Sequence, residues 1–259
     1  MATTSGSADS IVENSDANRP HPLLPRYYKT DEDKRRYLTA IFDATVADYD
    51  KLESWLSLGS GRKYRRDALL RAGIQPGMHI ADVAVGTGLV AAEALSIIGE
   101  HGSLVGIDPS TEMLRSARER LGIRTIVATA ESLPLESESM DAISMGYALR
   151  HVESLDLAFQ QFHRVLKRGG RVCILEITRP RTSVGRWILK AYLGTLTNIL
   201  GKVIKLSPRT PELWAYYGET IDKCVPPEQV LKALGDAGFV HAERQTSCGI
   251  LSEYTALKP

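Results

Sequence analysis

The chain has 259 residues, an apolar content of 43% and a formal net charge of +1. This length suits one large α/β domain or two small ones, and the apolar content is ample for a core. The balanced charge gives no reason to expect nucleic acid as a partner, because proteins that bind it usually gather a basic excess on one face. The three cysteines, Cys173, Cys224 and Cys248, lack the C-x-x-C spacing of a zinc site and the pattern of a disulfide framework. We therefore expect a protein of a reducing compartment with no bound metal.

The first 25 residues are rich in Ser, Ala, Thr, Asp and Asn and have no apolar periodicity. They predict a disordered tail before a single domain over residues 26–259. The segment also lacks a basic stretch followed by an apolar core, which favours a cytoplasmic protein. Residues 37–58 carry apolar side chains at helical intervals, interrupted near residues 48–50. They predict a helical cap over residues 30–70.

A glycine loop follows the cap. An apolar run ends at Asp82-Val83-Ala84, and Val85-Gly86-Thr87-Gly88 predicts a tight turn before a helix over residues 90–98. Small residues at Ala84, Gly86 and Gly88 would let a ligand approach the backbone N–H groups at the helix N-terminus. The spacing also fits the G-x-G-x-x-G/A dinucleotide pattern, so a nicotinamide cofactor stays open. Asp82 favours S-adenosylmethionine instead, because a carboxylate at the strand end suits an α-ammonium group and is unfavourable beside a pyrophosphate.

A second strand over residues 103–108 ends in Asp108 and is followed by Pro109 and a helix over residues 111–121. A carboxylate at the end of such a strand can accept both ribose hydroxyls, and Asp108 lies about 20 residues beyond the loop, at the spacing expected for that role. A helix N-cap is the alternative for Asp108. Met113 is expected over an adenine ring, with a core position as its alternative.

The remaining elements alternate between strand and helix. Residues 123–127 predict a third strand before Thr129-Ala130-Glu131, and residues 141–145 predict a fourth strand that ends in Gly146-Tyr147. An amphipathic helix over residues 155–166 is expected to end at the glycines of Lys167-Arg168-Gly169-Gly170, before a fifth strand over residues 172–177. This alternation predicts βαβ units and a parallel sheet.

Residues 182–206 interrupt this rhythm with two apolar helical segments. Interspersed lysines argue against a membrane-spanning helix. An insertion after the fifth strand would lie beside the ligand-binding edge of the sheet, so a lid over residues 182–222 suggests a hydrophobic substrate. Core packing and membrane-surface contact are the alternatives. Residues 212–222 and 227–237 predict further helices, and residues 238–247 and 249–257 predict a strand pair with one strand antiparallel to the rest.

From about Ile41 to Leu257 the sequence resembles the ubiquinone/menaquinone biosynthesis C-methyltransferases. The matching pieces are Phe42-Asp43 with Tyr49-Asp50, Leu56-Ser57-Leu58-Gly59 with Arg62, Asp82-Val83-Ala84 with Gly86-Thr87-Gly88, Ala130-Glu131 with Leu133-Pro134, Leu149-Arg150 with Val152, Arg164-Val165-Leu166-Lys167 with Gly169-Gly170-Arg171, Leu175-Glu176 with Pro180, and Glu219 with Ile221. The resemblance implies a Rossmann-like class I methyltransferase fold, with a seven-stranded, mostly parallel sheet containing one antiparallel strand. It also implies S-adenosylmethionine as cofactor and a hydrophobic small-molecule acceptor.

The resemblance gives expectations for the site. The arginine that matches Arg150 is thought to assist catalysis through a water and to stabilise negative charge on the acceptor oxygen. Tyr49 is expected to close over the cofactor, with a core role as its alternative. The cofactor-binding residues that we predict are Tyr49, Asp82, Ala84, Val85, Gly86, Gly88, Asp108, Pro109, Met113, Thr129, Ala130, Glu131 and Gly146. The acceptor-pocket residues that we predict are Tyr147, Trp187, Tyr192 and Tyr216, with packing roles as the alternative for the tyrosines at 147 and 216.

The chain departs from the family pattern at the site. Val85 and Leu89 replace the usual glycine and aspartate, Thr129 replaces asparagine or aspartate, and Gly61 replaces histidine. His151 stands where asparagine is usual and could act as a base, because its pKa is ordinarily near neutrality; a surface or capping histidine is the alternative. These departures suggest another acceptor, such as an aromatic, polyketide-derived or prenyl-derived carbon.

Several functions stay open at this point. They are C-, O- or N-methylation, S-adenosylmethionine binding without transfer, and an oxidoreductase that uses a nicotinamide cofactor. Asp82 and Ala130-Glu131 argue against the oxidoreductase. We expect no transmembrane segment and no nucleic-acid partner; peripheral membrane contact and a homodimer stay open as alternatives.

Overall fold

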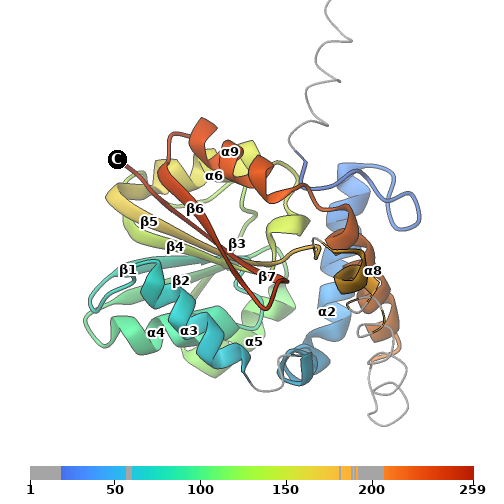
Figure 1. Cartoon of the computed structure of the whole chain (residues 1–259). Coiled ribbons are helices and arrows are strands. Elements are labelled where there is room, and N and C mark those ends of the chain that lie inside the picture. The colour runs from blue at the N-terminus through green and yellow to red at the C-terminus, as the bar shows by residue number, and fades with distance from the viewer. Residues whose placement is uncertain (1–18, 57–59, 181, 188, 190, 192–206) are drawn as a thin grey trace, which may run out of the picture.

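The computed structural model describes residues 19–56, 60–180, 182–187, 189, 191 and 207–259, without the side chains of residues 49–56. Its centre is a seven-stranded sheet in the order β3-β2-β1-β4-β5-β7-β6 (Figure 1). The strands are β1 (His79–Val83), β2 (Ser103–Asp108), β3 (Arg124–Val127), β4 (Met140–Gly146), β5 (Leu166–Ile177), β6 (Val240–Ser247) and β7 (Leu251–Leu257). The first five strands are parallel, and β7 runs antiparallel to both β5 and β6. This sheet confirms the class I methyltransferase fold expected from the sequence.

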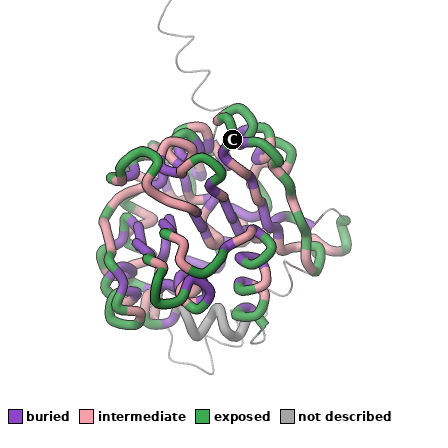
Figure 2. The backbone as a smooth tube through the Cα atoms, turned by 90° about the vertical axis from the view of Figure 1, so that its left-hand side faces the viewer, coloured by how far each residue is buried: buried purple, intermediate pink, exposed green. Residues whose placement is uncertain are grey.

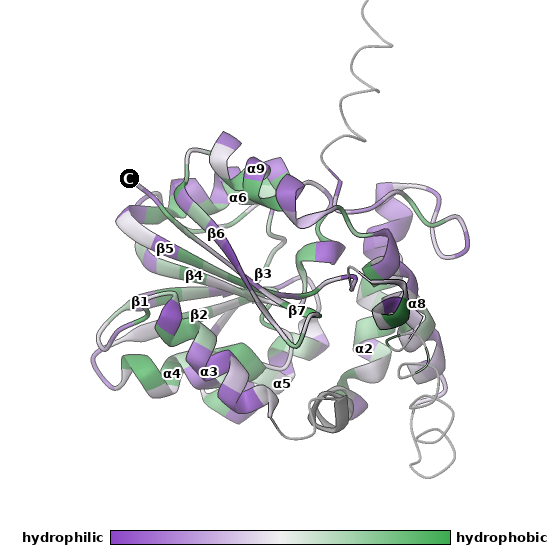
Figure 3. Cartoon of the chain, viewed as in Figure 1, coloured by the Kyte–Doolittle hydropathy of each residue, from purple (hydrophilic) through white to green (hydrophobic). Residues whose placement is uncertain are grey.

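Helices cover both faces of the sheet. Helices α3 (Gly61–Arg71), α4 (Leu89–Ile98) and α5 (Thr111–Leu121) lie on one face, and α6 (Leu155–Val165) and α9 (Pro227–Asp236) lie on the other (Figure 1). Figure 3 shows hydrophobic residues along the central strands β4 and β5, whereas the edge strand β6 is largely hydrophilic and the helices carry residues of both kinds. The buried residues lie along the strands and on the inner sides of the helices (Figure 2). The core therefore fills the space on both sides of the sheet, as in other layered α/β folds.

A separate helical layer stands across the carboxyl ends of the strands. It consists of α2 (Asp31–Leu56) and α8 (Thr210–Lys223), which lie side by side in Figure 1. Ile41 on α2 and Leu213 on α8 are buried in a cluster that also contains Leu24. None of the helices in the described part of the chain is long and apolar enough to span a membrane. This layer closes the edge at which ligands bind in open α/β sheets.

Three details differ from the sequence expectations. Helix α2 runs through residues 48–50 without a break. Helix α6 ends at Val165 because Leu166 is already extended, and Gly169 lies within β5 instead of ending the helix. Residues 19–25, assigned to a disordered tail, are packed: Leu24 is fully buried, and the Pro20 carbonyl accepts a 2.7 Å hydrogen bond from the N–H of Val225. Residues 1–18 lie outside the described residues, as does most of the predicted lid segment 182–206.

Candidate active site

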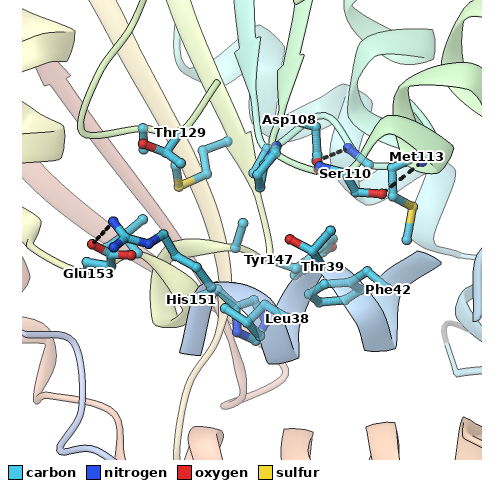
Figure 4. A pocket seen from close by; sticks show the side chains of 18 of the residues that line it. Leu38, Thr39, Phe42, Asp108, Ser110, Met113, Thr129, Tyr147, His151 and Glu153 are labelled. Atoms are coloured by element: carbon cyan, nitrogen blue, oxygen red, sulfur yellow. Dashed lines mark hydrogen bonds and ion pairs between the residues drawn. The ribbon is translucent and has the colours of Figure 1, made fainter. Parts of the chain in front are cut away.

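A cavity of about 220 Å³ lies between the carboxyl ends of β1, β2 and β4 and helix α2. Figure 4 shows Asp108, Ser110 and Met113 beside the strand ends, with Leu38, Thr39 and Phe42 on α2 opposite them. The cavity is lined by Lys34, Arg35, Leu38, Thr39, Phe42, Ala84, Gly86, Asp108, Pro109, Ser110, Met113, Thr129, Ala130, Glu131, Met145, Gly146, Tyr147, Ala148, His151, Val152, Glu153 and Tyr217. It therefore joins the predicted glycine loop to the helical layer.

The glycine loop presents its backbone to this cavity at Gly86. Gly86 has φ +55°, and a Cβ atom there would meet no protein atom within 4 Å. Gly88 caps α4 with φ +85°, but a Cβ there would lie 2.6 Å from a side-chain carbon of Leu121. Gly86 thus leaves room beside a ligand, whereas Gly88 leaves room for helix α5. Val85 is buried and packs against Gly106, so it does not line the cavity.

Asp108, the last residue of β2, is the buried carboxylate of the cavity. Its Oδ2 accepts a 2.9 Å hydrogen bond from the N–H of Gly86, and its Oδ1 accepts one of 2.9 Å from the N–H of Ser110. Burial raises the pKa of Asp108 to about 6, although both backbone N–H groups lower it. The carboxylate retains lone pairs for a ligand that donates hydroxyl hydrogens.

Asp82 lies beneath the cavity instead of in its wall. It is 1% exposed and accepts a 2.7 Å hydrogen bond from the hydroxyl of Ser144 on the neighbouring strand β4. Burial raises the pKa of Asp82 to about 7. Oδ1 is thus directed toward Ser144, while Oδ2 is buried without a hydrogen-bond partner among the described residues. The interaction of Asp82 with an α-ammonium group stays a prediction.

The other predicted cofactor residues surround the cavity. Pro109, Met113, Thr129, Ala130, Glu131, Gly146 and Ala84 all line it, whereas Val85, Asp82 and Gly88 do not. The Glu131 carboxylate accepts a 2.6 Å hydrogen bond from the N–H of Glu153, which ties the loop after β3 to the loop after β4. The side chain of Tyr49 lies outside the described residues. The structure thus brings together the ends of β1, β2 and β4 and the loop that follows β3.

Aromatic rings form the wall near α8. Phe42, Tyr147, His151 and Tyr217 line the cavity, and the His151 ring lies 5.5 Å from the Phe42 ring and 5.9 Å from the Tyr217 ring. His151 Nδ1 lies 3.3 Å from the Tyr216 hydroxyl, and Nε2 is buried without a hydrogen-bond partner among the described residues. Burial and the nearby Arg150 hold the pKa of His151 well below its usual range, so the imidazole is neutral at neutral pH.

Arg150 supports this wall from behind. It is 1% exposed, forms a buried ion pair with Glu176 and donates a 2.8 Å hydrogen bond to the Tyr147 carbonyl. Its guanidinium carbon lies 4.7 Å from the centre of the Tyr217 ring. Arg150 is not among the described residues that line the cavity, because Glu176, near the end of the adjacent strand β5, draws the guanidinium inward. Its expected action on the acceptor through a water stays a prediction.

Two of the predicted acceptor-pocket residues, Tyr216 and Trp187, do not line this cavity. Tyr216 is fully buried behind His151, with the two rings stacked at 5.5 Å, while its neighbour Tyr217 reaches the cavity. Trp187 is 71% exposed and borders a different hollow, beside α8. Tyr192 lies outside the described residues.

Helix α2 supplies several of the cavity residues that were not predicted from the sequence; the others are Ser110, Met145, Ala148, Val152, Glu153 and Tyr217. Lys34, Leu38 and Phe42 recur every fourth residue and so share one helix face. Lys34 is buried and donates a 2.8 Å hydrogen bond to the Val152 carbonyl; burial lowers the pKa of its amine to about 8. The four-residue spacing was visible in the sequence, but nothing local indicated that this face meets the strand ends.

Comparisons with known proteins agree with this geometry. The ubiE/COQ5 methyltransferase family matches residues 29–258. The "Ubiquinone/menaquinone biosynthesis C-methyltransferase UbiE" of Pseudoalteromonas translucida is 32% identical over 232 residues, which cover 86% of this chain and 91% of the relative. The protein of the same name from Shewanella sediminis is 34% identical over 226 residues, which cover 83% of this chain and 88% of the relative.

Solved structures share the fold at lower identity. A SAM-dependent methyltransferase from Thermotoga maritima aligns with a TM-score of 0.61 and 20% identity, over 85% of this chain and 99% of its own. Phosphoethanolamine N-methyltransferase 2 of Haemonchus contortus, in complex with S-adenosyl-L-methionine, aligns with a TM-score of 0.56 and 18% identity, over 76% of this chain and 52% of its own. The chain belongs to the ubiE/COQ5 methyltransferase family and is an S-adenosylmethionine-dependent methyltransferase.

Proposed function

We propose that the protein methylates a carbon atom of a hydrophobic aromatic, quinone-like or prenyl- or polyketide-derived small molecule. The observation that carries this proposal is the aromatic wall of Phe42, Tyr147, His151 and Tyr217 on the cavity. Flat rings of this kind favour a planar apolar acceptor. The names of the bacterial relatives, which describe C-methyltransferases of ubiquinone and menaquinone biosynthesis, support transfer to carbon.

We further propose that Asp108 binds the ribose of S-adenosylmethionine and that Gly86 admits the cofactor to the backbone. The fit rests on two features of this chain: the open space beside Gly86, and a buried carboxylate whose oxygens are already oriented by two backbone N–H groups. Met113, Thr129 and Ala130 would surround the adenine. When bound, the cofactor supplies an electrophilic methyl group on a sulfonium. In this proposal Asp82 also acts through the strand end that it anchors to Ser144.

His151 is our candidate for the group that accepts the acceptor's proton. Loss of a hydroxyl proton would place negative charge on the aromatic ring carbons, and the methylated carbon must later lose its own hydrogen. The imidazole is neutral and its ring lines the cavity, but Nδ1 lies beside the Tyr216 hydroxyl and Nε2 is buried without a hydrogen-bond partner among the described residues. A half-turn about the Cβ–Cγ bond exchanges each of these nitrogens with a ring carbon. The proposal requires this rotated imidazole, and Arg150 then holds the Tyr147 carbonyl and the Tyr217 ring in place.

The test is methyl transfer to a panel of hydroxylated aromatics with and without apolar side chains. Formation of S-adenosylhomocysteine identifies an acceptor, and NMR of the product distinguishes a methyl group on carbon from one on oxygen or nitrogen. We expect a C-methylated product and a kcat at least ~10²-fold lower for His151→Asn. His163→Asn is the matched control, because His163 packs against Phe239 and is not among the residues that line the cavity. An O- or N-methylated product would refute the proposed reaction, and a fully active His151→Asn enzyme would refute the role of His151.

A further inference from the structure

We propose that Asp43 of helix α2 is a positioning residue for the cofactor, acting through Ser110 on the carboxylate of Asp108. The N-terminal helix would then be part of the cofactor site and not only its cover. The inference rests on the proposed binding of the cofactor ribose by Asp108, and on contacts that the methyl-transfer proposal does not use.

A continuous hydrogen-bond path leads from α2 to the glycine loop. The Ser110 hydroxyl donates to the Asp43 carboxylate and accepts a 3.1 Å hydrogen bond from the N–H of Met113. The Ser110 N–H donates to Asp108 Oδ1 at 2.9 Å, and the N–H of Gly86 donates to Asp108 Oδ2 at 2.9 Å. Ser110 is 2% exposed, so water does not compete for these bonds. The position of α2 is thereby transmitted to Oδ1 of Asp108, while Oδ2 is held by the glycine loop.

Asp43 orients the hydroxyl of Ser110, and Ser110 in turn positions the N–H group that binds Asp108. Asp43 fixes the Ser110 hydroxyl rotor, because a carboxylate can only accept a hydrogen bond. With that hydrogen directed to Asp43, the hydroxyl oxygen is free to cap helix α5 at Met113. The capped turn holds the Ser110 N–H against Asp108. Removing Asp43 would release the hydroxyl and loosen this arrangement without touching any group that contacts the cofactor.

Asp43 also acts through its charge. Its carboxylate raises the pKa of Asp108, in addition to the larger effect of burial, while the N–H groups of Ser110 and Gly86 lower it. Asp82, on the adjacent strand β1, is the other carboxylate that interacts with Asp108. Among the described residues, no Lys, Arg or His forms an ion pair with Asp108. Asp43 thus adds to the effect of burial in favouring the protonated form of Asp108, whereas hydroxyl donors of a ribose would favour the ionised form.

Helix α2 approaches the cavity at the same place. Phe42, the residue before Asp43, lines the cavity together with Leu38 and Thr39, one turn earlier (Figure 4). A bound cofactor would thus contact one face of α2 while the adjacent Asp43 holds the loop that carries Asp108. Through Ser110, the position of helix α2 is coupled to the orientation and protonation of the Asp108 carboxylate.

The experiment measures the affinity of the full-length protein for S-adenosylhomocysteine by calorimetry between pH 5 and pH 7.5. The variants are Asp43→Asn, which keeps an oxygen for Ser110 and loses the charge, Asp43→Ala, which loses both, and Asp108→Asn. Asp33→Asn is the matched control, because Asp33 lies in the first turn of the same helix and pairs with Arg36 at the surface. Thermal melting of each variant establishes that it is folded.

With the pKa of Asp108 at about 6, wild-type affinity should fall about tenfold from pH 7.5 to pH 5. In Asp43→Asn this fall should move to lower pH by about half a unit, because one like charge is gone. Asp43→Ala should bind about tenfold more weakly at pH 7.5, and Asp33→Asn should match the wild type. Asp108→Asn should abolish the pH dependence.

Two results would overturn the proposal, and they differ. If Asp108→Asn retains the wild-type pH dependence, the ribose assignment has failed. If Asp108→Asn abolishes it but Asp43→Asn leaves it unshifted, Asp43 does not act on Asp108, and weaker binding by Asp43→Ala then reflects local packing alone. Neither result depends on the identity of the methyl acceptor, so the proposed reaction is tested separately.

Discussion

A methyl group added at Gly86 should block the cofactor without unfolding the protein. Gly86 has φ +55°, and a Cβ there meets no protein atom within 4 Å but projects from a residue that lines the cavity. Gly122 provides a matched comparison, because it has φ +67° and is equally free of neighbours, yet it caps the far end of helix α5. The two alanine variants therefore carry the same backbone cost and differ only in what the new methyl group faces.

The magnitudes follow from these two environments. A left-handed conformation costs an L-residue about 1–2 kcal/mol, so Gly86→Ala and Gly122→Ala should each lower Tm by a few degrees. In Gly86→Ala the added methyl group would also have to share space with the bound cofactor. Such overpacking costs about 1–3 kcal/mol of binding free energy, which corresponds to a loss of about 5- to 150-fold in affinity. Only Gly86→Ala should show this loss. Gly88→Ala should be the least stable of the three, since its Cβ would lie 2.6 Å from the side chain of Leu121.

The assay combines thermal melting with calorimetric titration of S-adenosylhomocysteine into the purified variants. Equal affinities for Gly86→Ala and Gly122→Ala, in proteins of equal stability, would show that the cofactor does not approach the backbone at Gly86. The cofactor loop would then have to be sought elsewhere on the sheet edge.

Two further predictions concern buried charges. Arg150→Ala should lower the free energy of unfolding by about 3–5 kcal/mol, because it leaves the Glu176 carboxylate buried without its partner. Arg36→Ala, at an exposed ion pair, should change the free energy of unfolding by less than about 1 kcal/mol. Urea titration measures both variants, and equal effects would contradict the predicted difference between the buried and the exposed pair. Asp82, with its pKa raised to about 7, binds a proton in the folded state that the unfolded state has lost, so folding stability falls as pH rises through this range. Relative to wild type, Asp82→Asn should therefore gain about 1.4 kcal/mol of stability per pH unit between pH 5 and pH 7. Measuring the difference cancels the opposing contributions of the buried histidines, and a difference independent of pH would show that Asp82 titrates normally.

The parts of the site that the sequence predicted are those formed by local backbone. The run from Asp82 to Gly88 forms a strand, a turn and a helix start within one stretch of chain, and Asp108 follows from strand alternation. Such elements depend on nearby residues through apolar periodicity and the freedom of glycine. Their ends therefore agree with the sequence expectations to within a few residues. Helix α6 is the informative exception: Leu166 is already paired with Met140 in the sheet, and a strand partner distant in sequence decides where the helix ends.

Side-chain direction was the part that the sequence could not supply. Neighbouring residues on α8 point about 100° apart, so either Tyr216 or Tyr217 could have faced the cavity. The choice is made by packing: Tyr216 enters a buried cluster with Tyr28 and Tyr37, which leaves Tyr217 for the cavity. Tyr37 belongs to the predicted helical cap and Tyr28 lies just before it, so their contact with Tyr216 depends on the docking of α2 against α8.

The two ends of the cavity are built from different kinds of element. The end at Gly86 and Asp108 is built from strand ends whose order is fixed by the sheet, so its backbone groups are positioned independently of the acceptor. The end at Phe42, His151 and Tyr217 is assembled from α2, the loop after β4 and α8, and changes at these positions leave the sheet intact. His151, where the family usually has asparagine, lies at this second end. Divergence in the methyl acceptor can therefore arise there without loss of the cofactor site. If Asp43 acts on Asp108 as we propose, α2 is the element that belongs to both ends.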